Sequence, residues 1–142
     1  MKPLPNRVLL TLTLALAALL TSCRTSRPRY VIGVSQCSND AWREKMNNEM
    51  LTEALLYDDV SVEIRSAEDN NNRQIADIRS FIDRGVDLLV VAPNEAIPVT
   101  PVVEEAYASG IPVIVVDRKI LSDQYTAYIG ADNYRIGKVI GE

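Results

Sequence analysis

Short apolar runs alternate with longer segments of helical periodicity along most of this chain. The clearest run is Ile111–Val116, which is rich in β-branched residues and ends abruptly at Asp117 and Arg118. A run this short and apolar predicts a strand buried on both faces, which is typical of a parallel sheet covered by helices. Because the ligand of such a sheet lies outside the carboxyl ends of the strands, Asp117 and Arg118 are expected at the ligand-binding edge.

Four other segments have the pattern of strands. Tyr30–Ser35 and Val86–Pro93 are mostly apolar, Val60–Arg65 alternates apolar and polar residues, and Thr126–Gly130 is short. The alternation predicts that 60–65 lies at or near an edge of the sheet.

Helical periodicity predicts helices over 40–57 and 73–84, with Gly85 as the cap of the second. A third helix is expected from Thr100, as N-cap, and Pro101, as the first helical residue, to Gly110, with a loop over 94–99. A final helix starts at Asp132 or Asn133. In the first helix the repeating positions are Trp42, Met46, Met50, Ala54 and Tyr57.

These elements predict a doubly wound α/β fold with a parallel sheet. Strands and helices alternate, and right-handed crossovers then give the strand order 2-1-3-4-5. The last helical pattern is still running at Glu142, with no cap and no closing strand. We therefore expect an apparently truncated domain.

The first 23 residues have the pattern of a targeting segment. Lys2 and Arg7 precede a 13-residue apolar run, which is of signal-peptide length. Leu20-Thr21-Ser22-Cys23 resembles a lipobox, in which Cys23 would carry a lipid and anchor the protein to the membrane. An ordinary signal peptide or an uncleaved anchor with a chance cysteine is the alternative. Residues 24–29 read as a tether, and 30–142 as the globular domain.

Composition removes several functional classes. The chain has no histidine, which excludes Ser/His or Cys/His catalytic pairs and histidine-based metal sites. Without the targeting segment the net charge is about −6, from 13 basic and 19 acidic residues. This acidic balance, without a basic stripe, argues against nucleic acid as a partner. No cofactor or metal is expected, because no glycine-rich dinucleotide turn or phosphate loop follows the first strand.

Polar side chains gather where the predicted strands end. One acid, one base, neutral polar groups and an aromatic suit a neutral polyhydroxylated ligand, because carboxylates accept from hydroxyls and an indole covers apolar C–H faces. Alternatively, Asp117 and Arg118 form a surface ion pair, Trp42 belongs to the core, and the others are loop or cap residues. The candidate ligand-binding residues are Ser35, Gln36, Asn39, Trp42, Asn94, Asp117 and Arg118.

From Tyr30 onward the chain resembles the first lobe of the type I periplasmic sugar-binding proteins, the ribose-binding family that includes the ligand domains of lactose-repressor-like regulators. The resemblance rests on Ile32–Ser35, Gly85–Val90, Gly110–Ile114 with Asp117-Arg118, and Ile129–Asn133. It implies a two-lobed fold of which this chain holds barely one lobe. It also implies that Asn39, Trp42, Asp117 and Arg118 line the sugar cleft.

The resemblance implies an exported, non-enzymatic domain of the periplasm or cell envelope that binds a monosaccharide between its lobes. Its partner would be a membrane permease, for uptake, or a membrane-bound sensor kinase. Two alternatives remain open at this point: a small hydrolase on the same scaffold, and the ligand domain of a sugar-responsive transcriptional repressor. The absence of histidine argues against the first, and the targeting segment against the second.

Overall fold

The computed structural model describes residues 28–142. The predicted targeting segment, Cys23 and residues 24–27 of the tether lie outside the described residues. Within 28–142, no helix has the length and apolar character needed to cross a membrane.

Five parallel strands form a single sheet in the order β2-β1-β3-β4-β5, so the predicted topology is confirmed. Strand β2 lies at one edge, as its alternating pattern predicted. In chain order the elements are β1 (Tyr30–Gln36), α2 (Ala41–Ala54), β2 (Val60–Ser66), α3 (Asn71–Arg84), β3 (Leu88–Val91), α4 (Ala96–Ala108), β4 (Val113–Val116), β5 (Ala127–Ile129) and α5 (Asn133–Gly141).

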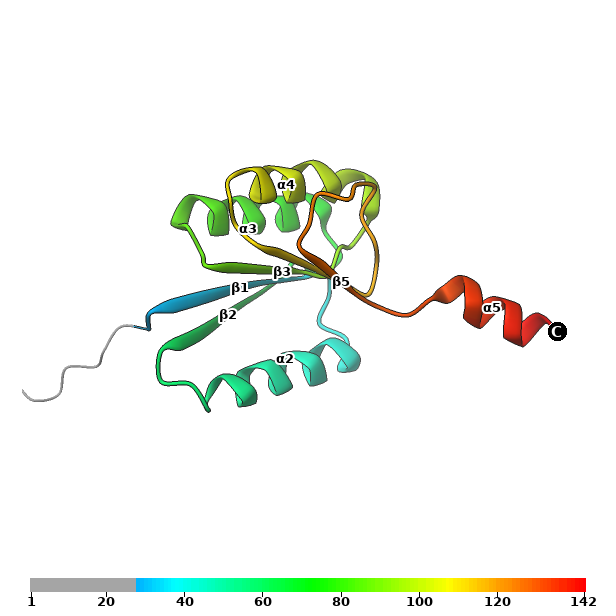
Figure 1. Cartoon of the computed structure of the whole chain (residues 1–142), viewed down its shortest axis with the longest axis horizontal. Coiled ribbons are helices and arrows are strands. Elements are labelled where there is room, and N and C mark those ends of the chain that lie inside the picture. Colours follow the sequence, from blue (N-terminus) through cyan, green and yellow to red (C-terminus); the bar gives the residue numbers. More distant parts are fainter. Residues whose placement is uncertain (1–27) are drawn as a thin grey trace, which may run out of the picture.

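Helices α3 and α4 cover one face of the sheet and α2 lies on the other, while α5 projects away from the body (Figure 1). The main core lies between the sheet and the α3–α4 layer, and most of its members are fully buried. They include Ile78, Phe81, Leu89, Val91, Val99, Val103, Val113 and Val115.

Strand β1 comes unusually close to α3 at Gly33. A Cβ at this position would lie 2.8 Å from the Phe81 ring, closer than side-chain carbons approach. Arg65 and Arg84 also lie over that ring, with their guanidinium carbons 4.7 and 5.6 Å from its centroid. The missing side chain therefore lets a buried aromatic ring pack directly on β1.

The α2 face of the sheet is only partly covered. An apolar hollow of about 330 Å³ lies between α2 and strands β1 to β3, lined by residues such as Met50, Tyr57, Val62 and Val90. Helix α5 has no buried residue, and its apolar Tyr134, Ile136, Val139 and Ile140 are all exposed. Within residues 28–142, the α2 face of the sheet and the apolar side of α5 thus remain largely uncovered.

The prediction for the third helix was wrong at its start. Helix α4 begins at Ala96, with Glu95 as N-cap, so Pro101 lies inside it. Thr100 is not a cap: its hydroxyl donates to the Ala96 carbonyl (2.7 Å) and accepts from the Leu121 amide (2.9 Å). Because Ile97 is exposed, water can reach the carbonyl that Pro101 leaves without an intrahelical donor.

The repeating pattern predicted for the first helix holds in its middle, where Met46, Met50 and Ala54 are half-buried, but not at its two ends. Trp42 and Tyr57 are exposed (56% and 52%), whereas Arg43 is buried and Asn47 hydrogen-bonds to Gln36 of β1. The interior is polar at the start of α2, so the apolar pattern does not identify which side chains are buried there.

Candidate sugar-binding edge

The carboxyl ends of β1, β3 and β4 meet at one edge of the sheet, and the first turn of α2 lies beside them. This is where the sequence placed the candidate residues. The structure brings Asp117 and the start of α2 into direct contact, through a residue that the sequence analysis did not name.

That residue is Arg43. Its side chain is 4% exposed, and its Nη2 donates to Asp117 Oδ2 at 2.6 Å. The Nε and Nη1 atoms are buried and have no hydrogen-bond partner among the described residues. Unpaired donors on a buried guanidinium are costly, so this group is suited to donate to a ligand as well as to Asp117.

The start of α2 fixes the position of Arg43. Asp40 caps the helix, because its Oδ1 accepts from the Arg43 amide at 3.0 Å. That backbone hydrogen bond, with a second from the Ser38 hydroxyl, lowers the pKa of Asp40 and keeps the cap ionised. The sequence analysis did not name Arg43, and the signal that could have found it is its place three residues after an N-cap that follows the first strand.

Trp42 presents an aromatic surface next to this pair. The Arg43 guanidinium carbon lies 4.6 Å from the centroid of the Trp42 ring, in cation–π contact. More than half of Trp42 is exposed. An exposed indole beside ionised groups can cover the C–H face of a sugar ring while those groups bind its hydroxyls.

The loops after β3 and β4 are tied together by Arg118 and Asn94. Arg118 Nη1 donates to the Asn94 carbonyl at 2.6 Å. Asn94 in turn donates from its side chain to Asn71 Oδ1 (2.8 Å) and from its amide to Gln74 Oε1 (2.8 Å). Gln74 is fully buried and also donates to the Ala92 carbonyl at 2.9 Å. The sequence analysis did not name Gln74, which also donates to the Ser35 carbonyl (3.5 Å) and so joins the ends of β1 and β3.

Three of the predicted residues lie elsewhere at this edge. Ser35 and Gln36 are in the interior, 1% and 0% exposed, and Ser35 Oγ and Gln36 Oε1 have no hydrogen-bond partner in the described part of the chain. Gln36 Nε2 donates to Asn47 Oδ1 at 2.6 Å. Asn39 is an exposed residue of the loop that precedes α2. Ligand contact by these three stays a prediction.

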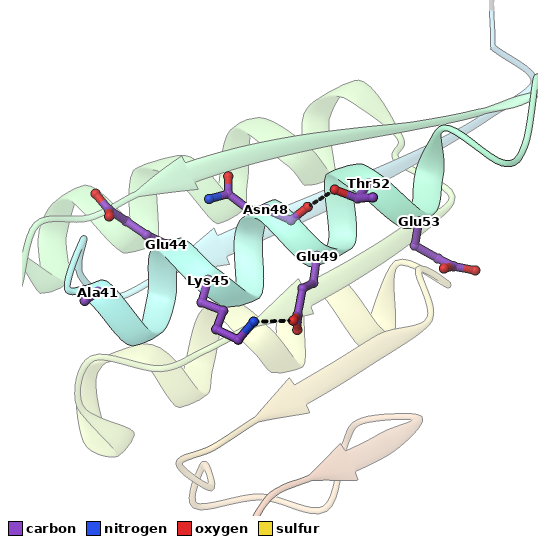
Figure 2. A pocket seen from close by; sticks show the side chains of 7 residues that line it. All are labelled: Ala41, Glu44, Lys45, Asn48, Glu49, Thr52 and Glu53. Carbon is purple, nitrogen blue, oxygen red and sulfur yellow. Dashed lines mark hydrogen bonds and ion pairs between the residues drawn. The ribbon is translucent and has the colours of Figure 1, made fainter.

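Two surface hollows lie near the start of α2 and the end of β4. The larger, about 680 Å³, runs along α2 and is lined only by residues of that helix, including Glu44, Lys45 and Glu49 (Figure 2). A hollow with a single wall cannot enclose a ligand. The other, about 620 Å³, is lined by Asp117, Arg118, Tyr128 and the segment that leads into α5. It adjoins the Arg43–Asp117 pair, so we place the candidate site there.

Comparison with known proteins agrees with this chemistry. Residues 31–142 match the family described as "Periplasmic binding protein domain". The galactofuranose-binding protein YtfQ of Escherichia coli is 33% identical over 90% of this chain and 41% of its own. The fructose-binding periplasmic domain of the hybrid two-component system BT1754 is 65% identical, with a TM-score of 0.76 over 79% of this chain and 37% of that one.

A third similar structure is the arabinose-transporter binding protein of Shewanella sp. ANA-3, bound to α- and β-L-arabinofuranose. It is 28% identical, with a TM-score of 0.66 over 79% of this chain and 41% of that one. All three are described as binding proteins and none as an enzyme, which argues against the hydrolase alternative. This chain spans about two fifths of their lengths. The parallel α/β fold and the sugars that these relatives bind agree with the prediction from the sequence. The chain thus belongs to the periplasmic binding protein family.

Proposed function

We propose that this chain is the sugar-binding lobe of an exported binding protein whose ligand is a monosaccharide in its five-membered-ring form, D-fructose first among the candidates. The observation that carries the proposal is the contact of Trp42, Arg43 and Asp117 at the carboxyl edge of the sheet. A small ring can place one face on the indole and its hydroxyls on the carboxylate and guanidinium.

The ring form is supported by what the similar proteins bind. They are described with fructose, galactofuranose and arabinofuranose as ligands. Fructose is a ketohexose that forms both six- and five-membered rings in solution, so a five-membered ring is a form that all three ligands can take although their hydroxyls differ.

Sensing is favoured over uptake. The 65% identical domain belongs to a hybrid two-component system, whereas the arabinose-transporter protein is 28% identical. The complete protein would then report sugar binding to a membrane-bound kinase. Sugar-dependent phosphorylation of the kinase in membranes supports sensing, and sugar uptake that requires this protein, without such phosphorylation, supports transport.

The periplasm, with anchoring through a lipid on Cys23, is the proposed location. The support is the lipobox sequence that ends at Cys23. The lipid would be attached to the thiol of Cys23, so a variant without that thiol cannot accept it. Cys23→Ala should abolish incorporation of a radiolabelled fatty acid, while Cys37→Ala serves as control. Label that persists in the Cys23→Ala variant would contradict the anchor.

Calorimetric titration of the complete binding protein tests the ligand. We expect D-fructose to bind, and D-glucose, which is almost entirely in six-membered rings, to bind at least about tenfold more weakly, a difference of about 1.4 kcal/mol. Preference for D-glucose would contradict the ring-form proposal. If no sugar in a panel that includes D-ribose, L-arabinose and D-galactose binds, the proposed function is wrong.

A further inference from the structure

Asp117 has an unusual backbone. Its φ is +67°, in the left-handed region, although it is not a glycine. The Asp117 amide donates to the Ile129 carbonyl at 2.8 Å, and the Asp117 carbonyl accepts from the Tyr128 hydroxyl at 2.7 Å. Strand β5 therefore holds the backbone of Asp117, while Arg43 of α2 holds its carboxylate.

The Tyr128 hydroxyl can reach Asp117 only because residue 130 is a glycine. A Cβ on Gly130 would lie 2.1 Å from the Tyr128 oxygen and 3.0 Å from the Asp117 carbonyl oxygen. The φ of Gly130 is outside the left-handed region, so the constraint at this position is space and not backbone conformation. The Tyr128 ring packs against the main core, which fixes the direction of its hydroxyl.

We propose that Tyr128 and Gly130 are positioning residues for sugar binding: the Tyr128 hydroxyl holds Asp117 in its left-handed conformation and so directs the Asp117 carboxylate into the cleft. This inference rests on the proposed function, in which Asp117 contacts the sugar. Tyr128 also lines the hollow beside Asp117, with its hydroxyl donated to the Asp117 carbonyl. We expect it to act through Asp117, so that its removal costs affinity only while Asp117 has its carboxylate.

The experiment is a double-mutant cycle on the complete binding protein, titrated with D-fructose. Tyr128→Phe keeps the ring in the core and removes only the hydroxyl. One hydrogen bond of this kind corresponds to about 3- to 10-fold in affinity. We expect that loss in the parent background and a loss of less than about twofold in the Asp117→Asn background, because the two residues act as one unit.

Gly130→Ala provides an independent variant. Its Cβ displaces the Tyr128 hydroxyl, so we expect it to weaken fructose binding at least as much as Tyr128→Phe does. Gly137→Ala is the matched control, because a Cβ there meets nothing within 4 Å among residues 28–142. Unchanged affinity in Tyr128→Phe, or an equal loss with and without the Asp117 carboxylate, would overturn the inference.

A measurement without sugar separates this inference from the proposed function. The ¹³Cα and ¹⁵N chemical shifts of Asp117 report its backbone conformation. We expect both shifts to move in Tyr128→Phe and Gly130→Ala and to stay in place in Gly137→Ala. If the shifts move but the parent binds no sugar, the proposed function is wrong and so is the role in binding. If the parent binds fructose and the shifts do not move, only the positioning role is wrong.

Discussion

At the scale of single residues, the candidate site depends on a carboxylate shared between protein and ligand. The Asp117 side chain is 39% exposed, whereas that of Arg43, its partner, is 4% exposed. The carboxylate thus has one oxygen paired inside the protein and remains accessible to a ligand outside it. Arg118, by contrast, is exposed, and within residues 28–142 its guanidinium hydrogen-bonds only to the Asn94 carbonyl.

Two substitutions in the complete protein separate these roles. Asp117→Asn should weaken sugar binding by about 10- to 150-fold, because a hydrogen bond to a charged group contributes roughly 1.5–3 kcal/mol. It should also lower the melting temperature, since Arg43 loses a charged partner. Arg118→Ala should weaken binding by a similar factor with an unchanged melting temperature. Calorimetry and thermal unfolding measure both, and affinities within about threefold of the parent would contradict the assignment.

Glu63 gives the lobe a dependence on pH away from the site. Hydrogen bonds from Arg84, and secondarily from Arg65, lower the pKa of Glu63 from its usual 4.5 to about 2. A lowered pKa in the folded state adds stability above pH 4.5, and that stability is lost as the pH falls toward 2. Because the pair is about two fifths exposed, we expect its contribution to be about 1 kcal/mol.

Glu63→Gln should therefore reduce the free energy of unfolding at pH 7 by about 1 kcal/mol and have less effect at pH 3. Urea unfolding at the two pH values provides the measurement, and Glu49→Gln, on the exposed face of α2, is the control. An equal loss at both pH values would show that the charge of Glu63 does not carry this contribution.

At the scale of elements, the contact between β1 and α3 depends on the absence of a side chain. Gly33→Ala places a Cβ 2.8 Å from the Phe81 ring, which is fully buried and cannot move outward easily. We expect a loss of about 1–3 kcal/mol in the free energy of unfolding. Gly137→Ala, in α5, is the control. An unchanged denaturant midpoint in Gly33→Ala would contradict this account of the packing.

How much of these elements was predictable depends on how each residue is buried. The strands and their order follow from apolar runs and crossover handedness, and Gly85 caps α3 in the left-handed conformation expected of it. Arg43 was not predictable by hydrophobicity, because a charged residue faces inward there. The start of α4 was missed because prolines suggested a later boundary. The Tyr128–Asp117 hydrogen bond was not predictable from periodicity, because it depends on the room that Gly130 leaves by having no side chain.

At the scale of the whole molecule, α2 covers only part of its face of the sheet. Glu53 is the single charged residue among those that line the apolar hollow of that face in the described part of the chain. Since this chain spans about two fifths of its relatives, we expect the remaining residues of the complete protein to cover that face. Residues 30–142 expressed alone should bind the dye ANS, associate into large species and bind no sugar measurably.

Dye fluorescence and size-exclusion chromatography compare this fragment with the complete protein, which should elute as one species and bind little dye. A fragment that is monodisperse, unfolds cooperatively and binds fructose would contradict the prediction. Met50→Gln in the fragment is expected to reduce dye binding, because Met50 lines the hollow.

Helix α5 is too short and too exposed to be stable by itself. It has nine residues and none of them is buried. An isolated helix of that length is marginal in water, because the entropy lost in nucleation is recovered only over roughly 12–15 residues. Its own hydrogen bonds therefore do not sustain it, and the free energy that does must come from burial of its apolar side against another part of the complete protein. The helical state of α5 is thus a measure of assembly in the complete protein and not a property of its local sequence.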